Sequence, residues 1–253
     1  MLNVLTIKIE SNMRLKNTAT VLLMLLIVNV SYAAGLVISP FRANLSATQT
    51  SAVFNVANQR ETPMVVQVNT VEWLQQVSGE DVFNDTQDII ATPAIVTIPP
   101  KTNYVIRVGL LKDITSTQEK TYRLFIEEIP SPDTQKTGLN IALRASLPIF
   151  VAPKFITPAP PSIAWTLKRI TKDSVVLSAH NTGNSHVQIL GYHFLLNGVE
   201  VFKNTKVLSY LLPNTQKEWT IKTDKLLPQQ TIQLHIKTDI TEQVLVTDIT
   251  VEG

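Results

Sequence analysis

The longest regular pattern in the chain is an alternation of apolar and polar positions over residues 138–153. A spacing of two is the period of a β-strand, so this pattern predicts one long strand rather than a helix. Its polar face carries Asn140, Arg144 and Ser146. Its apolar face is formed by Leu139, Ile141, Leu143, Ala145, Leu147, Ile149 and Val151. At ~3.3 Å per residue, about twelve residues of this strand would run ~40 Å, about twice a typical strand, so we expect a partner beyond its own sheet.

Pro148 lies inside this predicted strand. Proline has no N–H to donate to a strand ladder, so it is found at edges and irregularities of sheets. We therefore expect Pro148 at a sheet edge, at a bulge, or where the pairing of the strand changes.

Shorter strand-like segments separated by turn residues fill the rest of the chain. Before the long strand they are predicted at 36–45, 52–56, 64–73, 94–98, 104–111 and 122–129. After it they are predicted at 164–170, 174–180, 187–197, 217–222, 230–238 and 243–251. The acidic segment 81–91 is predicted to be a loop, and residues 181–184 and Asn197-Gly198 are predicted to form hairpin turns. This spacing is typical of Ig-like β-sandwiches.

A proline-rich segment marks the strongest domain boundary. Residues 153–161 contain four prolines, which make a stiff and extended connection. We predict an all-β protein in which an Ig-like domain at 34–153 is joined by a linker at 154–161 to a second Ig-like domain at 162–253. An N-terminal extension and signal peptide would occupy residues 1–33.

The signal-peptide prediction rests on three features of the N-terminal region. Residues 13–16 give a basic start, residues 21–30 an apolar run, and Ser31-Tyr32-Ala33 a small-x-small cleavage pattern. The apolar run is about half of the ~20 residues that a membrane helix needs. We expect cleavage near Ala33 or Ala34, export, and a mature form that is not embedded in a membrane. Translation may start at Met1 or at Met13, and the sequence leaves this open.

The amino-acid composition excludes several classes of function. The chain of 253 residues contains no cysteine, which excludes thiol chemistry and cysteine-based metal sites. Hydrophobic residues make up 44% of it, which is ample for folded cores. The formal net charge is +2 and the basic residues are scattered, so we expect no nucleic-acid partner.

A search for catalytic patterns also returns little. The four histidines, at positions 180, 186, 193 and 235, lack the spacing of metal ligands and are interpreted as polar residues on strands or turns. Glu127 and Glu128 are adjacent on a predicted strand and point to opposite faces, which does not suit a carboxylate pair. We predict no enzyme activity, no metal, no cofactor and no small-molecule substrate.

Three arginines stand in apolar, strand-like surroundings: Arg42, Arg123 and Arg144. Each alone is explained by a solvated strand face or by an ion pair with Glu127 or Glu128. Taken together they could line one anion site, because the arginine fork binds a carboxylate at two points.

These features together resemble the periplasmic chaperones of the chaperone–usher pilus pathway, the family of PapD. The most specific segments are LNIAL (139–143), TIPP (97–100), YRLFIEEIP (122–130) and PFR (40–42). LRASLPIFV (143–151) and NTGNSH (181–186) are more similar to the archaic branch of the family. The similarity covers essentially the whole mature chain.

The resemblance implies two Ig-like domains in a boomerang arrangement and a location in the periplasm. It implies pilin subunits and an outer-membrane usher as partners. The long strand of the first domain would be lent to an incomplete pilin subunit in donor-strand complementation, a form of β-augmentation. The donor row would be Leu139, Ile141 and Leu143, the same residues that the alternation places on one face.

Members of this family hold the C-terminal carboxylate of the subunit with an arginine near the N terminus and a lysine on the last strand of the first domain. Arg42 matches the arginine, but the lysine position falls on Pro148. The resemblance therefore favours Arg123 as the second anchoring residue, with Arg144 in reserve.

The alternative from another functional class is an exported two-domain β-sandwich module for adhesion or carbohydrate binding. Such a module would need a platform of aromatic side chains. Aromatic residues make up 6% of the chain and are dispersed, so we prefer the chaperone hypothesis.

Overall fold

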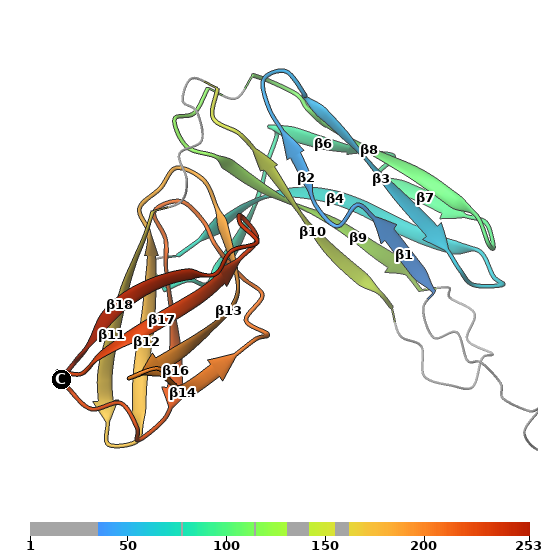
Figure 1. Cartoon of the computed structure of the whole chain (residues 1–253). Coiled ribbons are helices and arrows are strands. Elements are labelled where there is room, and N and C mark those ends of the chain that lie inside the picture. The colour runs from blue at the N-terminus through green and yellow to red at the C-terminus, as the bar shows by residue number, and fades with distance from the viewer. Residues whose placement is uncertain (1–34, 77, 114, 131–141, 155–161) are drawn as a thin grey trace, which may run out of the picture. The chain divides into compact units, whose positions relative to one another are not determined.

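The computed structural model describes residues 35–76, 78–113, 115–130, 142–154 and 162–253 (Figure 1). Every regular element in these ranges is a β-strand, which confirms the all-β prediction. The predicted signal peptide and most of the predicted linker lie outside the described residues. No helix in the described ranges has the length and apolarity that a membrane span needs.

The first sandwich is built from strands β1 to β10, coloured blue to yellow-green in Figure 1. One sheet has the order β1-β3-β8-β6 and contains β1 (Leu36–Ser39), β3 (Ser51–Asn58), β8 (Asn103–Leu110) and β6 (Ile89–Thr92). The other has the order β2-β10-β9-β4-β5 and contains β2 (Ala43–Leu45), β10 (Arg144–Val151), β9 (Lys120–Ile129), β4 (Met64–Gln75) and β5 (Asp81–Asp85). The short β7 (Ile95–Ile98) pairs with the first part of β4.

The core of this sandwich lies between the two sheets and follows the alternation of the sequence. Phe54 and Val56 of β3 face Leu124 and Ile126 of β9, and all four side chains are fully buried in one apolar cluster. Polar or exposed positions alternate with them along β3. Burial of such aliphatic and aromatic side chains is the main source of stability in a chain that has no disulfide.

The second sandwich is built from strands β11 to β18, coloured yellow to red in Figure 1. One group of strands is β11 (Ile163–Thr171), β12 (Ser174–Asn181) and β16 (Gln216–Lys222). The other is β13 (Val187–Leu196), β14 (Val199–Asn204), β15 (Ser209–Leu211) and β17 (Thr231–Thr238). The last strand, β18 (Leu245–Glu252), joins the groups because it pairs antiparallel with β17 and parallel with β11. A separate apolar cluster fills this sandwich.

Strand β10 is the described part of the predicted long strand. Leu147, Ile149 and Val151 are buried in the core, whereas Arg144 and Ser146 are exposed, as the alternation predicts. The prediction was wrong at residues 142 and 143, where the backbone is not in a strand. Residues 138–141, and with them Leu139 and Ile141 of the predicted donor row, lie outside the described residues.

Pro148 lies where the pairing of β10 changes, as predicted. All of β10 pairs with β9, but on its other side only Ile149 to Val151 pair, in parallel, with β2. Pro148 is the last residue before that parallel pairing begins. A residue without an N–H is tolerated at position 148 because, at that position, no described strand pairs with this side of β10.

Two local predictions were wrong, and two short strands were missed. Segment 81–91 is not a loop: β5 pairs with the end of β4, and Ile89 and Ala91 of β6 alternate into the core. Residues 181–184 do not form a hairpin between adjacent strands, because β12 pairs with β11 and β16 while β13 lies in the other group. The short strands β14 and β15 were not predicted. The turn at Asn197-Gly198 is confirmed, with positive φ values of 52° and 78° between β13 and β14.

Candidate functional site

Arg42 lies in the short break between β1 and β2, and it reaches the second sandwich. Its Nη1 donates to Oδ2 of Asp239, which follows β17, at 2.5 Å. The arginine side chain is 41% exposed and the aspartate side chain 12% exposed. The hydrogen bond to Asp239 raises the pKa of Arg42 above its usual value, so this guanidinium stays charged.

Arg123 lies on β9 in a much drier environment. Its Cζ is 3.7 Å from the centroid of the Trp73 ring, which places the cation over the face of a fully buried indole. Its Nε is buried and has no hydrogen-bond partner among the described residues. Burial lowers the pKa of Arg123, yet an arginine remains cationic in proteins. Arg123 is therefore a half-buried cation whose buried Nε is an unused donor.

Tyr210, on β15 of the second sandwich, is the shared neighbour of the two arginines. Its ring packs edge-on against Trp73, with centroids 5.4 Å apart, and lies 5.7 Å from Cζ of Arg123. Burial is the largest effect on the Tyr210 hydroxyl and raises the pKa of Tyr210. The positive charges of Arg42 and Arg123 act in the opposite direction on the same pKa. The structure thus brings Arg42 and Arg123 together around one side chain.

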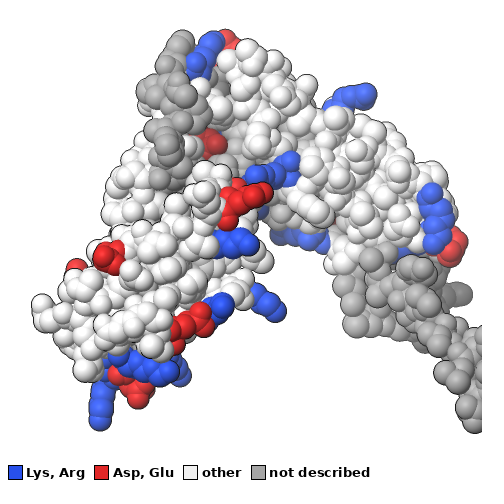
Figure 2. All heavy atoms as spheres, viewed as in Figure 1, with Lys and Arg blue, Asp and Glu red and all other residues white. Residues whose placement is uncertain are grey.

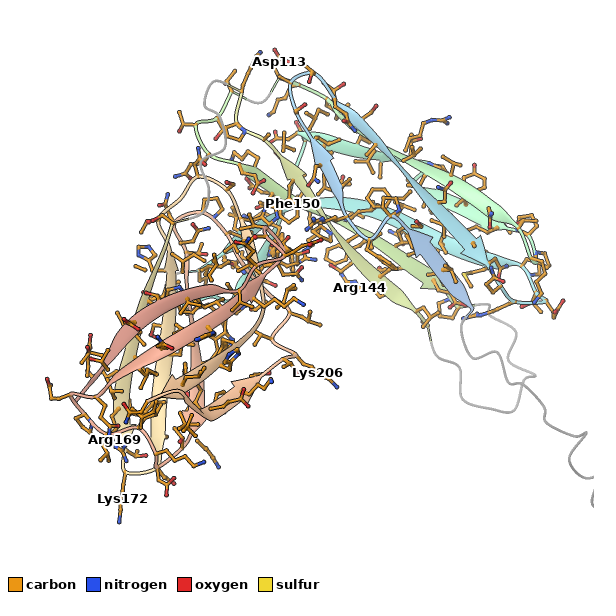
Figure 3. All side chains as sticks on the ribbon, viewed as in Figure 1. Asp113, Arg144, Phe150, Arg169, Lys172 and Lys206 are labelled. Atoms are coloured by element: carbon orange, nitrogen blue, oxygen red, sulfur yellow. The ribbon has the colours of Figure 1, made fainter. Side chains whose placement is uncertain are left out.

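An aromatic cluster surrounds this group, and we call Trp73, Phe150, His186, Tyr210 and Leu212 the junction cluster. Phe150 of β10 stacks on His186 with centroids 3.4 Å apart and planes 7° from parallel. Figure 3 shows Phe150 toward the C-terminal end of β10 among densely packed side chains. Trp73, Phe150 and Leu212 are buried together, with Tyr210 against them. Sequence reasoning took His186 for an ordinary turn residue and missed this role.

Two polar side chains of the first sandwich hold the second sandwich at the cluster. Gln75, at the end of β4, accepts hydrogen bonds from the Leu212 N–H and the Thr215 hydroxyl and donates one to the Tyr210 carbonyl, each at 3.0 Å. Glu119 accepts from the His186 N–H at 2.8 Å and bonds to its Nδ1 at 2.6 Å. These residues are far apart in sequence, so no local pattern could have predicted that they meet.

Arg144 does not join the other two arginines. Its Nε forms an ion pair with Glu127, and its Cζ lies 4.1 Å from the Phe125 ring centroid. Figure 3 shows it at the opposite end of β10 from Phe150. The neighbouring Glu128 faces the other way and bonds to Arg60. Arg144 is therefore explained by an ion pair with Glu127, which is one of the two explanations that the sequence allowed for each arginine alone.

A small apolar groove lies beside the unpaired part of β10. It has a volume of about 270 Å³. Its walls are Leu36, Ile38, Phe41, Leu143, Arg144, Ala145 and Leu147. Phe41 is 78% exposed, and Leu143 is half-buried. An extended segment that paired with this edge of β10 would find backbone hydrogen-bonding groups and an apolar surface side by side.

Charged side chains are dispersed over the face of the molecule that Figure 2 shows. Figure 2 shows Lys and Arg mixed with Asp and Glu on the visible face, without a continuous basic area. A basic stripe is the usual mark of a surface that binds nucleic acid. The cations with special environments are therefore those at the junction cluster.

Comparison with known proteins defines the class of this chain. Residues 35–157 match the family model described as "Pili and flagellar-assembly chaperone, PapD N-terminal domain". The chain is 22% identical over 211 residues to the chaperone protein PmfD of Proteus mirabilis, covering 81% of this chain and 80% of PmfD. These matches show that residues 35–157 form the N-terminal domain of a PapD-like pilus assembly chaperone, in agreement with the resemblance seen in the sequence.

Solved structures show the same fold. One is the CsuC–CsuE chaperone–tip adhesion subunit pre-assembly complex from the archaic chaperone–usher Csu pili of Acinetobacter baumannii, with a TM-score of 0.66, 18% identity, and coverage of 87% of this chain and 100% of that chain. Another is the SafB chaperone complex with the SafA pilin of Salmonella enterica, with a TM-score of 0.56, 14% identity, and coverage of 85% and 96%. These similarities confirm the prediction of two β-sandwich domains.

Proposed function

We propose that this protein is a periplasmic chaperone that binds, folds and caps incomplete Ig-like pilin subunits by donor-strand complementation and delivers them to an outer-membrane usher. The match of residues 35–157 to the PapD N-terminal domain and the similarity to the chaperone PmfD support the proposal. The protein would be exported with a signal peptide at 1–33 and would act through domains at 34–153 and 162–253. The resemblance of 143–151 and 181–186 to the archaic branch favours a role in an archaic pilus system.

The observation that carries the proposal is the half-open edge of β10. Arg144 to Pro148 pair with β9 on one side and with no described strand on the other. Open edges of strands are templates for the addition of another strand. In this strand the open part adjoins an apolar groove, so an added strand would gain both backbone hydrogen bonds and apolar contact.

We assign Leu139, Ile141 and Leu143 as the donor row. Leu143 lines the groove, and the other two continue the same alternation toward the N terminus. Burial of three large aliphatic side chains contributes on the order of 5–9 kcal/mol before the cost of ordering the chains. That range suits a complex that is stable but can still be exchanged for a better-fitting strand.

We assign Arg42 and Arg123 as the anchor for the C-terminal carboxylate of the subunit. Arg42 offers an accessible guanidinium, and Arg123 offers a half-buried one with an unused Nε donor. Both charges act on one neighbour, Tyr210, which supports a shared anchor. Arg144 is engaged by Glu127, so we keep it only in reserve.

The test is co-expression in a periplasm with a candidate pilin subunit, followed by purification of the chaperone. Wild type should recover the subunit, and a variant with Leu139, Ile141 and Leu143 all replaced by serine should not. The matched control replaces three exposed apolar residues of the second sandwich, Val199, Leu227 and Ile240, by serine and should behave as wild type. Survival of the complex in the donor-row variant would show that this strand is not the one lent.

A further inference from the structure

The pair between Arg42 and Asp239 has a consequence for binding. We propose that Asp239 is an internal competitor: it occupies Arg42 in the free chaperone and is displaced by the carboxylate of an incoming subunit. The inference rests on the proposed function, because it concerns the same anchor. It adds a residue of the second sandwich that sets the affinity of that anchor.

Asp239 is held in place to present a carboxylate to Arg42. Its Oδ1 accepts a hydrogen bond from the Gln188 N–H at 2.9 Å, and its own N–H donates to the Gln188 carbonyl at 3.1 Å. The other oxygen, Oδ2, faces Nη1 of Arg42 at 2.5 Å. The aspartate thus offers the same chemical group that the end of a polypeptide chain offers, from a fixed position.

The pair is built so that a better ligand can replace it. Asp239 uses one nitrogen of Arg42, whereas a free carboxylate can bind a guanidinium through two parallel hydrogen bonds. The arginine side chain is 41% exposed, and exposed ion pairs stabilise proteins little. Asp239 and the C-terminal carboxylate of a subunit would repel each other if both bound Arg42. Binding of the subunit is therefore favoured when the Asp239 side chain moves away from the guanidinium.

Arg123 gives a second reason why the subunit carboxylate would displace Asp239 from Arg42 rather than bind beside it. It is half-buried beside Tyr210, and its buried Nε has no partner among the described residues. A carboxylate that contacts both arginines would satisfy this donor as well as Arg42. Among the described residues, Asp239 pairs with Arg42 and not with Arg123, so it neutralises only one of the two cations of the proposed anchor.

The test compares Asp239→Asn with wild type in competition for a limiting amount of the co-expressed pilin subunit. Asparagine keeps the shape and the hydrogen bond to Gln188 but removes the charge. We expect the variant to be enriched in the complex by about two- to fivefold, the effect of one partly exposed charge pair. Asp248→Asn, an exposed aspartate on β18, gives the same change in net charge and should show no enrichment.

A second measurement uses labelled peptides with the C-terminal sequence of that pilin, as the free acid and as the amide. Asp239→Asn should bind the acid more tightly than wild type does and should not differ from wild type for the amide. Equal or weaker capture by Asp239→Asn, with capture by wild type intact, overturns this inference and leaves the proposed function standing. If wild type captures no subunit, the proposed function fails and this inference fails with it.

Discussion

The guanidinium groups of Arg42 and Arg123 experience opposite surroundings, although they share one neighbour. Arg42 is accessible to water and paired with a carboxylate, whereas Arg123 is half-buried and lies over an indole. A buried cation costs free energy unless it is compensated, and the ring of Trp73 compensates Arg123 only in part. A residue that is costly to the fold and poorly paired is a candidate for function.

We expect Arg42→Ala and Arg123→Ala each to abolish recovery of the co-expressed subunit while the chaperone stays folded. Each change removes one of the two cations that would hold the subunit carboxylate. Affinity purification from the periplasm measures recovery, and circular dichroism checks the fold. Arg107→Ala, at an exposed position on β8, is the matched control. Recovery at the wild-type level in both variants would contradict the assignment.

At the scale of single elements, the alternation of β10 and the turn at Asn197-Gly198 could be predicted from the sequence because both depend on local geometry. The strands β5 and β6 could not. Their short, acidic segment lacks a strong strand propensity, and it is ordered by pairing with β4 and β8. Tertiary context of this kind overrides local preference.

The connection between β5 and β6 is tied to β9 and to the end of β8 through Asp88. Its Oδ2 accepts a hydrogen bond from the Tyr122 hydroxyl at 2.9 Å, and its Oδ1 pairs with Nζ of Lys112 at 2.6 Å. Lys112 first, and the Tyr122 hydroxyl next, lower the pKa of Asp88 against the opposing effect of burial. Asp88 therefore binds its proton less tightly in the folded chain than in the unfolded one.

A lowered carboxyl pKa stabilises the fold above the unfolded pKa of ~3.9 and loses this effect as pH falls toward the folded pKa. We expect Asp88→Asn to lower the free energy of unfolding at pH 7 by about 1 kcal/mol. The difference from wild type should shrink at about pH 3. Urea denaturation at both pH values measures it, with the exposed Asp85→Asn as control. A deficit that is the same at both pH values would contradict this account.

At the scale of the whole molecule, the proposed anchor depends on both sandwiches. Arg42 and Arg123 come from the first, whereas Tyr210 and Asp239 come from the second. The sequence indicated the two arginines because charge is conspicuous in apolar strands. It could not indicate their partners, because residues such as Gln75 and Tyr210 are 135 positions apart and meet only in the folded chain.

We expect Gln75→Ala to loosen the contact between the two sandwiches at the junction cluster. The variant removes the acceptor of the Leu212 N–H and leaves that buried donor unpaired, which costs about 1–3 kcal/mol. Hydrogen exchange at the Leu212 amide should become faster, and subunit recovery should fall because Tyr210 is less firmly held. Gln233→Ala, at an exposed position on β17, should change neither quantity. Unchanged exchange at Leu212 would show that Gln75 does not hold the contact.

The indole of Trp73 gives the molecule an optical property. Trp73 is fully buried, touches a cation on one face and is surrounded by rings from both sandwiches. The two other tryptophans, Trp165 and Trp219, lie together in the second sandwich at 6.4 Å between ring centroids. Emission from Trp73 should therefore report on the polarity and charge around Arg123, and a version of the chain that keeps only this tryptophan would signal a carboxylate that binds the proposed anchor without any added dye.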